Sequence, residues 1–201
     1  MNICNRTWRR LCGVGHAKGY GVQSPAAYQF VRQVLFAPAD PAVSAAIGNQ
    51  WPHMDRRTRR LGQLYYRLAR HLQPGLVVDF APAADACRDF MKAGCPDAVV
   101  QSVPPGQKFS DYSELVQQLG TIDLARITLA EGCDGFVESV LDSASAASVF
   151  IIENIWRDDL SRLWWDELRR DERVSVSYDL YLCGLLTFNP KLYKRTYLLN
   201  L

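Results

Sequence analysis

The sequence predicts an α/β fold with a mostly parallel sheet and an antiparallel ending, and three observations carry that prediction. From Gly75 onward, short apolar runs alternate with amphipathic stretches of helical length, which is the pattern of βαβ units. The run at 149–153 is apolar until it ends in Glu153 and Asn154, as expected of a strand buried on both faces. Near the C-terminus two apolar runs follow each other too closely for a crossover helix, so they should pair antiparallel.

The expected elements can be placed along the chain in order. The alternation of Val174, Val176 and Tyr178 with small polar residues indicates a half-exposed strand. Gly94 is expected to end the helix that precedes the second strand. Strands are expected at 76–80, 97–101, 122–128, 149–153, 174–180, 183–188 and 193–199, and helices at 83–93, 111–119, 134–146 and 157–170.

The first 74 residues differ from the rest and are interpreted as a helical extension packed on a domain that spans 75–201. Ser24 and Pro25 suit a helix start, with Ser as N-cap and Pro at the first helical position. Pro38, Pro41 and the 48–52 segment are expected to interrupt helical structure. A second helix is expected at 55–72. Tyr28, Val31, Val34 and Leu35 should share one face of the first helix, and Leu61, Leu64, Tyr65, Leu68 and Leu72 one face of the second.

Composition indicates an ordinary globular protein. The chain has 201 residues, of which 48% are hydrophobic and 22% charged, and its formal net charge is +2. No apolar run approaches the roughly 20 residues of a membrane span, and the first residues lack the apolar core of a signal peptide. We therefore expect a cytoplasmic protein without membrane contact. Six cysteines show no C-x-x-C pair or zinc spacing and are interpreted as reduced thiols, with a disulfide framework as the alternative.

Two surface features bear on partners. Arg56, Arg60, Gln63, Arg67 and Arg70 fall on one face of the 55–72 helix, and such a basic stripe can meet phosphates. A solvated face whose arginines lie over the apolar rim is the simpler interpretation, so a nucleic-acid partner is not expected. Of the adjacent Trp164 and Trp165, one ring should belong to the core and the other should be partly covered. A homodimer whose interface buries one of the two rings is kept as an alternative.

Four segments carry a resemblance to a known family. Lys18-Gly-Tyr-Gly-Val-Gln-Ser-Pro25 resembles a K-x-H-G-I-H-S-P opening, and the stretch at 61–79 resembles the helix that leads into a first strand. Ile151-Ile-Glu-Asn-Ile-Trp156 resembles an I-x-F-D-D-I-H-W strand end, and 174–188 resembles a V-x-V-x-I-D-L-F-x-x-G-L-V-F-F ending. These motifs are similar to those of a bacterial group of class I S-adenosylmethionine-dependent methyltransferase-like proteins.

The resemblance implies a Rossmann-like methyltransferase fold and S-adenosylmethionine as cofactor. It does not indicate the methyl acceptor or a catalytic residue. Because few residues separate the second expected strand from the third, one edge strand of the family's usual seven is expected to be missing or short. The residues implied to line the cofactor cleft are Asp79, Phe80, Ala81, Ala83, Gln101, Ser102, Asp123, Glu153 and Asn154.

The cofactor motif departs from the family's pattern. The turn after the first strand should resemble E-L-G-x-x-x-G, because glycine lets the backbone approach the cofactor closely, yet 78–85 contains no glycine. Asp79 matches the acidic position, Ala81 stands for the first glycine, and Pro82 lacks a backbone donor. Gln101 stands where an acidic residue should accept bonds from the ribose hydroxyls. The prediction is a methyltransferase-like protein with weakened or lost activity, and the alternative is a non-catalytic binding module.

A comparison with the metal-dependent branch, typified by catechol O-methyltransferase, concerns Glu153 and Asn154. They stand at the position of that branch's Asp-Asn magnesium pair, and Thr128 stands in the place of its other carboxylate. A weak magnesium site stays open. The favoured interpretation is that Glu153 and Asn154 cap the following helix, so no metal is expected. None of the three histidines has a Ser or Cys nearby in a nucleophile context, which argues against a hydrolase triad.

Overall fold

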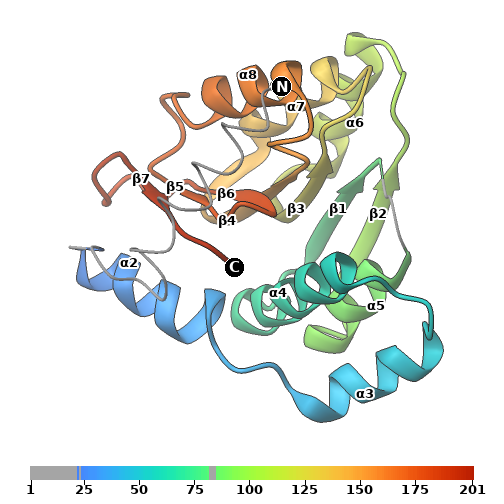
Figure 1. Cartoon of the computed structure of the whole chain (residues 1–201). Helices are drawn as coiled ribbons and strands as arrows, with labels where there is room; N and C mark the ends of the chain where they lie inside the picture. The colour runs from blue at the N-terminus through green and yellow to red at the C-terminus, as the bar shows by residue number, and fades with distance from the viewer. Residues whose placement is uncertain (1–21, 23, 82–84) are drawn as a thin grey trace.

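A single seven-stranded sheet lies between two layers of helices (Figure 1). The computed structural model describes residues 22, 24–81 and 85–201. Its strand order is β2-β1-β3-β4-β6-β5-β7. The strands are β1 (Leu76–Phe80), β2 (Val99–Val103), β3 (Ile122–Thr128), β4 (Ala144–Glu153), β5 (Val176–Asp179), β6 (Cys183–Thr187) and β7 (Arg195–Leu198).

The predicted fold class is confirmed by the strand directions. β2, β1, β3 and β4 run parallel, whereas β6 pairs antiparallel with both β4 and β5. The short segment between β2 and β3 holds one helix, and β2 forms an edge of the sheet. At the opposite edge β7 pairs parallel with β5, which brings the described sheet to seven strands.

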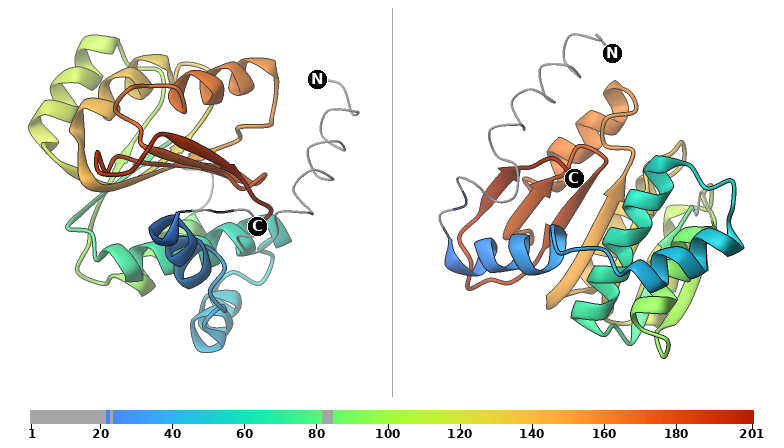
Figure 2. Two further views of the ribbon diagram at one scale, coloured as in Figure 1. Left: turned by 90° about the vertical axis from the view of Figure 1, so that its left-hand side faces the viewer. Right: turned by 60° about the horizontal axis from the view of Figure 1, so that its bottom comes forward.

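The helices divide between the two faces of the sheet (Figures 1 and 2). Alternate strand residues face opposite layers, so Val77 and Ile151 belong to the core cluster that contains α4, while Val78 and Ile152 belong to the cluster that contains α6, α7 and α8. One layer contains α2 (Pro25–Phe30), the π-helical η2 (Val31–Leu35), α3 (Pro41–Gln50), α4 (Arg56–Leu72) and α5 (Asp85–Gly94); the other contains α6 (Phe109–Leu119), α7 (Asp134–Val140), the 3-10 turn η3 (Leu141–Ser143) and α8 (Asp159–Leu168). None of the helices in the described part of the chain has the length and apolar character needed to cross a membrane.

The N-terminal helices begin at side-chain caps. Ser24 accepts a hydrogen bond from the Ala27 N–H, which confirms the expected start of α2. The expected interruption around Pro41 is wrong, because Asp40 caps α3 by accepting from two backbone N–H groups, and Pro41 occupies its first position. Tyr28 is also placed wrongly by the sequence pattern, since its side chain is 45% exposed. The division into 1–74 and 75–201 stays a prediction.

One helix prediction and one strand prediction need correction. The expected helix at 134–146 ends at Val140, and the chain enters β4 at Ala144 after the η3 turn. β5 is buried on both faces rather than half-exposed, because β6 and β7 flank it and helices cover both sides. Its polar side chains have partners there: the Ser177 hydroxyl lies 2.8 Å from the Thr196 hydroxyl. Such small hydroxyls make an interior strand look half-exposed in sequence.

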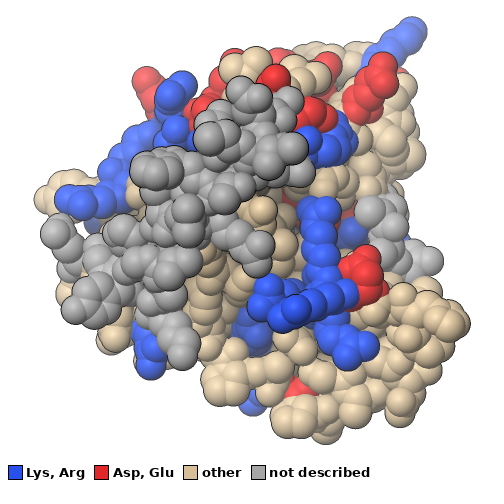
Figure 3. All heavy atoms as spheres, in the orientation of Figure 1, with Lys and Arg blue, Asp and Glu red and all other residues tan. Residues whose placement is uncertain are grey.

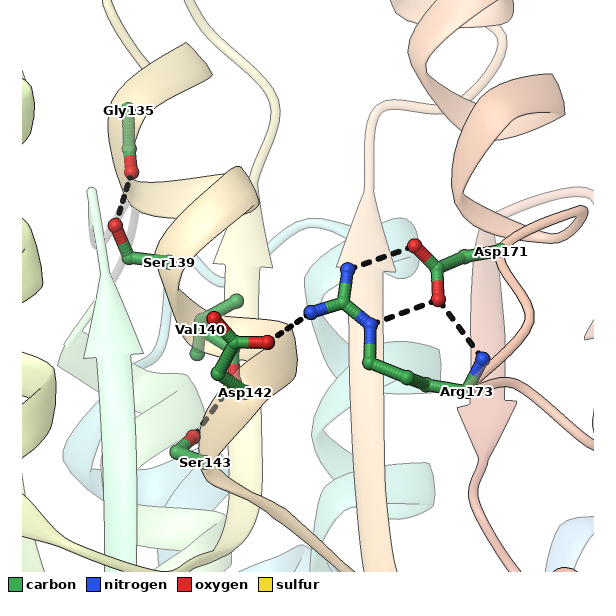
Figure 4. A network of polar contacts seen from close by, with 7 residues as sticks. All are labelled: Gly135, Ser139, Val140, Asp142, Ser143, Asp171 and Arg173. Atoms are coloured by element: carbon green, nitrogen blue, oxygen red, sulfur yellow. Dashed lines mark hydrogen bonds and ion pairs between the residues drawn. The ribbon is translucent and has the colours of Figure 1, made fainter.

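Arg173 joins the turn after α8 to the end of α7 (Figure 4). Its Nε and Nη2 donate to the two carboxylate oxygens of Asp171, at 2.8 and 2.7 Å, and its Nη1 donates to Asp142 in η3. The hydrogen bonds with Asp171 are the largest cause of a raised pKa for Arg173. Because the Asp142 side chain is 75% exposed, this network orients the helix ends and adds little to stability.

We expect Asp158→Ala to destabilise the protein by about 1 kcal/mol at pH 7, the usual effect of losing an N-cap. Asp158 accepts from the Ser161 N–H at 2.7 Å. This hydrogen bond is the largest cause, and the hydrogen bond from Arg157 the second, that lowers the pKa of Asp158 to about 2. The stabilisation is therefore present above pH 4 or so and is lost as the pH falls through about 2.

Chemical denaturation of both proteins between pH 7 and pH 2 measures this difference, and Asp158→Asn is the matched control because it keeps a capping oxygen. A constant difference across the whole pH range would contradict the assignment of the cap to the charged carboxylate.

Candidate functional site

A buried ionic network lies where β1, β3 and β4 approach their carboxyl ends. Arg126 of β3 donates from Nη1 to Asp79 Oδ2 of β1 at 3.2 Å and from Nε to Glu153 Oε1 of β4 at 2.7 Å. Tyr65 of α4 donates its hydroxyl to the same Glu153 oxygen at 2.5 Å. The side chains of Arg126, Asp79 and Glu153 are 0%, 1% and 7% exposed. We call these four residues the Arg126 network.

The strand register assembles this network. Asp79 pairs with Arg126 across β1 and β3, and Glu153 pairs with Thr128 across β3 and β4. Because side chains alternate along a strand, residues 79, 126 and 153 all face α4. Tyr65, whose ring lies under the Arg126 guanidinium at 5.7 Å, closes the network from the helical layer. The network is therefore a consequence of the sheet and does not depend on a loop.

Electrostatics favour the charged form of Arg126. Burial by itself lowers the pKa of this guanidinium, but Glu153, Tyr65 and Asp79 outweigh burial, and the pKa is raised above its ordinary value. The pKa of Tyr65 is raised well above its usual range, mainly by burial and next by the negative charge of Glu153. Tyr65 is thus a neutral hydrogen-bond donor, and Arg126 is a permanent cation between two carboxylates.

The expected cofactor residues at the end of β1 lie in different surroundings. Phe80 is fully buried and stacks on Phe136 with ring centroids 4.3 Å apart. Ala81 has φ 51° and donates its N–H to the Val103 carbonyl. A left-handed φ favours glycine, so the backbone here keeps a glycine-type conformation with an alanine in it. Ala83 lies outside the described residues.

The residues expected at the second strand and at Asp123 do not come together. Gln101 is exposed on the edge strand β2. The Ser102 hydroxyl accepts a hydrogen bond from Arg88 of α5. Asp123 lies at the opposite end of β3, where its Oδ2 accepts from the Gly75 and Leu76 N–H groups at 2.8 and 3.0 Å. The structure thus separates Asp123 from the carboxyl edge, and it gives Ser102 a cationic neighbour.

The expectation that Glu153 and Asn154 cap the following helix is wrong, because the N-cap of α8 is Asp158. Their side-chain oxygens instead accept hydrogen bonds from arginines of the protein. Glu153 Oε1 is bound by Arg126 and Tyr65, while Asn154 Oδ1 accepts from Arg57 Nη2 of α4 at 2.9 Å. Thr128 is buried beside Glu153, and its hydroxyl has no hydrogen-bond partner among the residues that the structure describes. The described residues contain no group of three or more His, Cys, Asp or Glu side chains placed to hold a metal ion. The oxygens of Glu153 and Asn154 do not fit a magnesium site, because the guanidinium groups of Arg126 and Arg57 already bind them.

Sequence reasoning missed the two residues that organise this edge, Arg126 and Tyr65. Arg126 is a charged residue inside the otherwise buried strand β3, and a lone charge in a buried strand indicates an internal partner. That signal could have been found. Tyr65 offered none beyond its place in an apolar helical stripe, which predicts only burial.

A second polar feature is a cavity of about 250 Å³ beside the end of β4. It is lined by Arg57, Asn154, Trp156, Arg157, Tyr181 and Leu182. Asn154 and Tyr181, with φ 64° and 69°, both have left-handed backbones. Asp179 joins two of the walls, since its Oδ1 accepts from Trp156 Nε1 at 3.3 Å and from the Tyr181 N–H at 3.0 Å.

The expected basic stripe of α4 is partly structural. Arg67 donates to the Val34 and Leu35 carbonyls at 2.9 and 2.8 Å and thereby holds η2 against α4. Arg70 donates to the Tyr66 hydroxyl at 3.2 Å. Figure 3 shows Lys and Arg side chains gathered in the middle of this face, where Figure 1 places α4, with acidic side chains beside them. The stripe is therefore not a uniform phosphate-binding surface.

We expect Cys87 and Cys183 to resist thiol reagents in the native protein. Both are buried, and they border the Arg126 network electrostatically. Burial, the largest cause, raises the pKa of Cys87 to about 12 and that of Cys183 well above its usual range, so the reactive thiolate is scarce at pH 8.

Alkylation at pH 8 with peptide mapping by mass spectrometry should find these two thiols unmodified in the native protein and fully modified in denaturant. If the two thiols were alkylated as fast in the native protein as in denaturant, the burial of Cys87 and Cys183 beside the Arg126 network would be contradicted.

Comparison with solved structures identifies the fold. A Podospora anserina methyltransferase with bound S-adenosylhomocysteine superposes with a TM-score of 0.53 at 14% identity, covering 83% of this chain and 96% of that one. An O-methyltransferase from Bacillus cereus, also in complex with S-adenosylhomocysteine, gives a TM-score of 0.51 at 13% identity over 81% of this chain and 97% of that one. No protein-family model matches the sequence, and no curated protein matches it either. The chain thus has the class I methyltransferase fold.

Proposed function

We propose that this chain is an S-adenosylmethionine methyltransferase-like protein in which cofactor binding is weakened or lost and whose remaining role is binding. The observation that carries the proposal is the Arg126 network. Two carboxylates expected in the cofactor cleft, Asp79 and Glu153, are turned under α4 and bonded to a buried guanidinium. If Asp79 or Glu153 turned away from Arg126 to bind a ligand, the buried guanidinium would lose one of its two carboxylate partners, and an unpaired buried charge is costly.

The residues at the carboxyl ends of β1 and β2 support the same proposal. At the β1 turn Ala81 carries a Cβ in a left-handed backbone conformation, where a glycine would let the backbone approach a cofactor more closely. The cofactor's ribose hydroxyls would find the neutral amide of Gln101 in place of a carboxylate, and a hydrogen bond to a neutral acceptor is roughly half as strong. Arg88 also engages the neighbouring Ser102 hydroxyl. The residues present fit the cofactor poorly.

The test is a restoration experiment. We expect the double variant Ala81→Gly/Gln101→Glu to bind S-adenosylhomocysteine at least about tenfold more tightly than the natural sequence, because it returns one glycine and one charged acceptor. Ala81→Gly/Gln101→Ala is the matched control, since it keeps the backbone change without the carboxylate. Calorimetric titration measures all three proteins. Equal affinities across the three would mean that these departures are not what limits cofactor binding.

A further inference from the structure

We propose that the cavity beside the end of β4 binds a small organic anion, one carboxylate or phosphate group on a flat apolar body. This cavity, which we call the Arg57–Arg157 pocket, has the lining given above. Two arginines from different parts of the chain converge on it, Arg57 from the first turn of α4 and Arg157 from the segment between β4 and α8. Among the described residues that line the pocket, none is acidic.

Both guanidinium groups have donors to spare. Arg57 uses only Nη2 for its hydrogen bonds, to Asn154 Oδ1 at 2.9 Å and to the Leu182 carbonyl at 3.4 Å. Arg157 uses Nη1 for the Leu129 carbonyl and Nε for Asp158. This leaves Arg57 Nε and Nη1 and Arg157 Nη2 without acceptors among the described residues. Guanidinium donors anchored in this way are well suited to carboxylates and phosphates.

The walls of the pocket are set in advance by the fold. Asp179 is fully buried and bonds both Trp156 Nε1 and the Tyr181 backbone N–H. The Arg162 guanidinium lies 4.1 Å from the Trp156 ring centroid and holds that ring from α8. Tyr181 occupies a left-handed backbone conformation at the turn between β5 and β6. Strain of this kind in a large non-glycine residue is concentrated at ligand-binding sites.

The size and lining of the pocket set the class of ligand. A cavity of about 250 Å³ is below the usual range for drug-sized ligands, so the ligand is small. Two aromatic side chains favour a flat apolar body, and two arginines favour an anionic group on it. Binding at this pocket does not depend on S-adenosylmethionine, so it is measured without that cofactor.

The experiment is calorimetric titration of the full chain with phenyl phosphate and benzoate. Benzamide is the neutral counterpart, and inorganic phosphate is the anion without a ring. We expect the two aromatic anions to bind at least about tenfold more tightly than benzamide, and phenyl phosphate more tightly than inorganic phosphate. Equal binding of benzamide would overturn the role of the arginines, and equal binding of inorganic phosphate would overturn the role of the aromatic rings.

Variants assign any binding to the pocket. Arg57→Gln and Arg157→Gln should each weaken binding of the aromatic anions about tenfold, whereas Arg60→Gln, an exposed arginine of α4 outside the lining, should leave it unchanged. Circular dichroism checks that each variant is folded. If a glutamine variant does not fold, Arg57→Lys or Arg157→Lys replaces it at the same position. Unchanged affinity in both folded glutamine variants would overturn the proposal.

Discussion

Arg126→Met should destabilise the protein by about 3–5 kcal/mol, the typical cost of removing one partner from a buried ion pair. The substitution leaves Asp79 and Glu153 with exposures of 1% and 7% and without their shared cation. Methionine fills a similar volume, so the loss is electrostatic rather than a cavity effect. Chemical denaturation at pH 7 measures it. The variant should regain part of the loss as the pH is lowered, since protonation removes the uncompensated charge.

The matched control removes the charges together. In Asp79→Asn/Arg126→Met/Glu153→Gln no carboxylate is left without a cation, and we expect most of the stability lost in Arg126→Met to return. Arg126→Lys, which keeps the charge but not the two-sided geometry, should fall between the natural sequence and Arg126→Met. If Arg126→Met loses less than about 1 kcal/mol, the level of an exposed pair, the network is not the buried ionic unit described here.

Gly184→Ala should cost up to about 3 kcal/mol, at the upper end for overpacking a well-filled core. Gly184 lies in β6 between Ile152 and Asp179 of the neighbouring strands. A Cβ added there would lie 2.4 Å from atoms of the Trp165 ring. Trp165 belongs to α8 and its side chain is fully buried, so the ring has little room to move away.

A double-mutant cycle separates this contact from other effects. Trp165→Ala alone should cost about 3–5 kcal/mol as the loss of a buried aromatic side chain. In the Trp165→Ala background, Gly184→Ala should cost almost nothing, because the ring that it would strike is gone. Guanidinium denaturation of the four proteins gives the coupling energy. Additive losses would show that Gly184 is required for some reason other than the approach of Trp165.

Local pattern predicted the sheet well and the N-terminal helices less well. β1 and β3 have the predicted bounds because each is a mostly apolar segment between clear breaks, despite the charged residues that it contains. α3 was missed because Pro38 and Pro41 were interpreted as breakers, although the Asp40 cap makes Pro41 a first helical residue. The prediction of one core tryptophan is confirmed, since Trp165 is fully buried and Trp164 is partly exposed.

The candidate site was predictable only in part. The sequence indicated that Asp79 and Glu153 belong to strand ends, and the structure confirms that placement. It could not indicate that both carboxylates meet Arg126, because the register of parallel strands is set by crossover packing and is not encoded in either strand alone. Asp123 was assigned to the cleft from its strand, but it stands at the start of that strand and bonds the chain entering β1.

The proposal that cofactor binding is weakened or lost is tested most directly by calorimetric titration. The natural sequence, shown to be folded, is titrated with S-adenosylmethionine and S-adenosylhomocysteine. We expect no measurable heat of binding until ligand concentrations approach the millimolar range, because the carboxylates of the cleft are held by Arg126 and the β1 turn lacks glycine. Micromolar binding of either ligand would contradict the proposal. Ala81 and Gln101 would then be adequate cofactor contacts, and the chain would have to be considered an active methyltransferase.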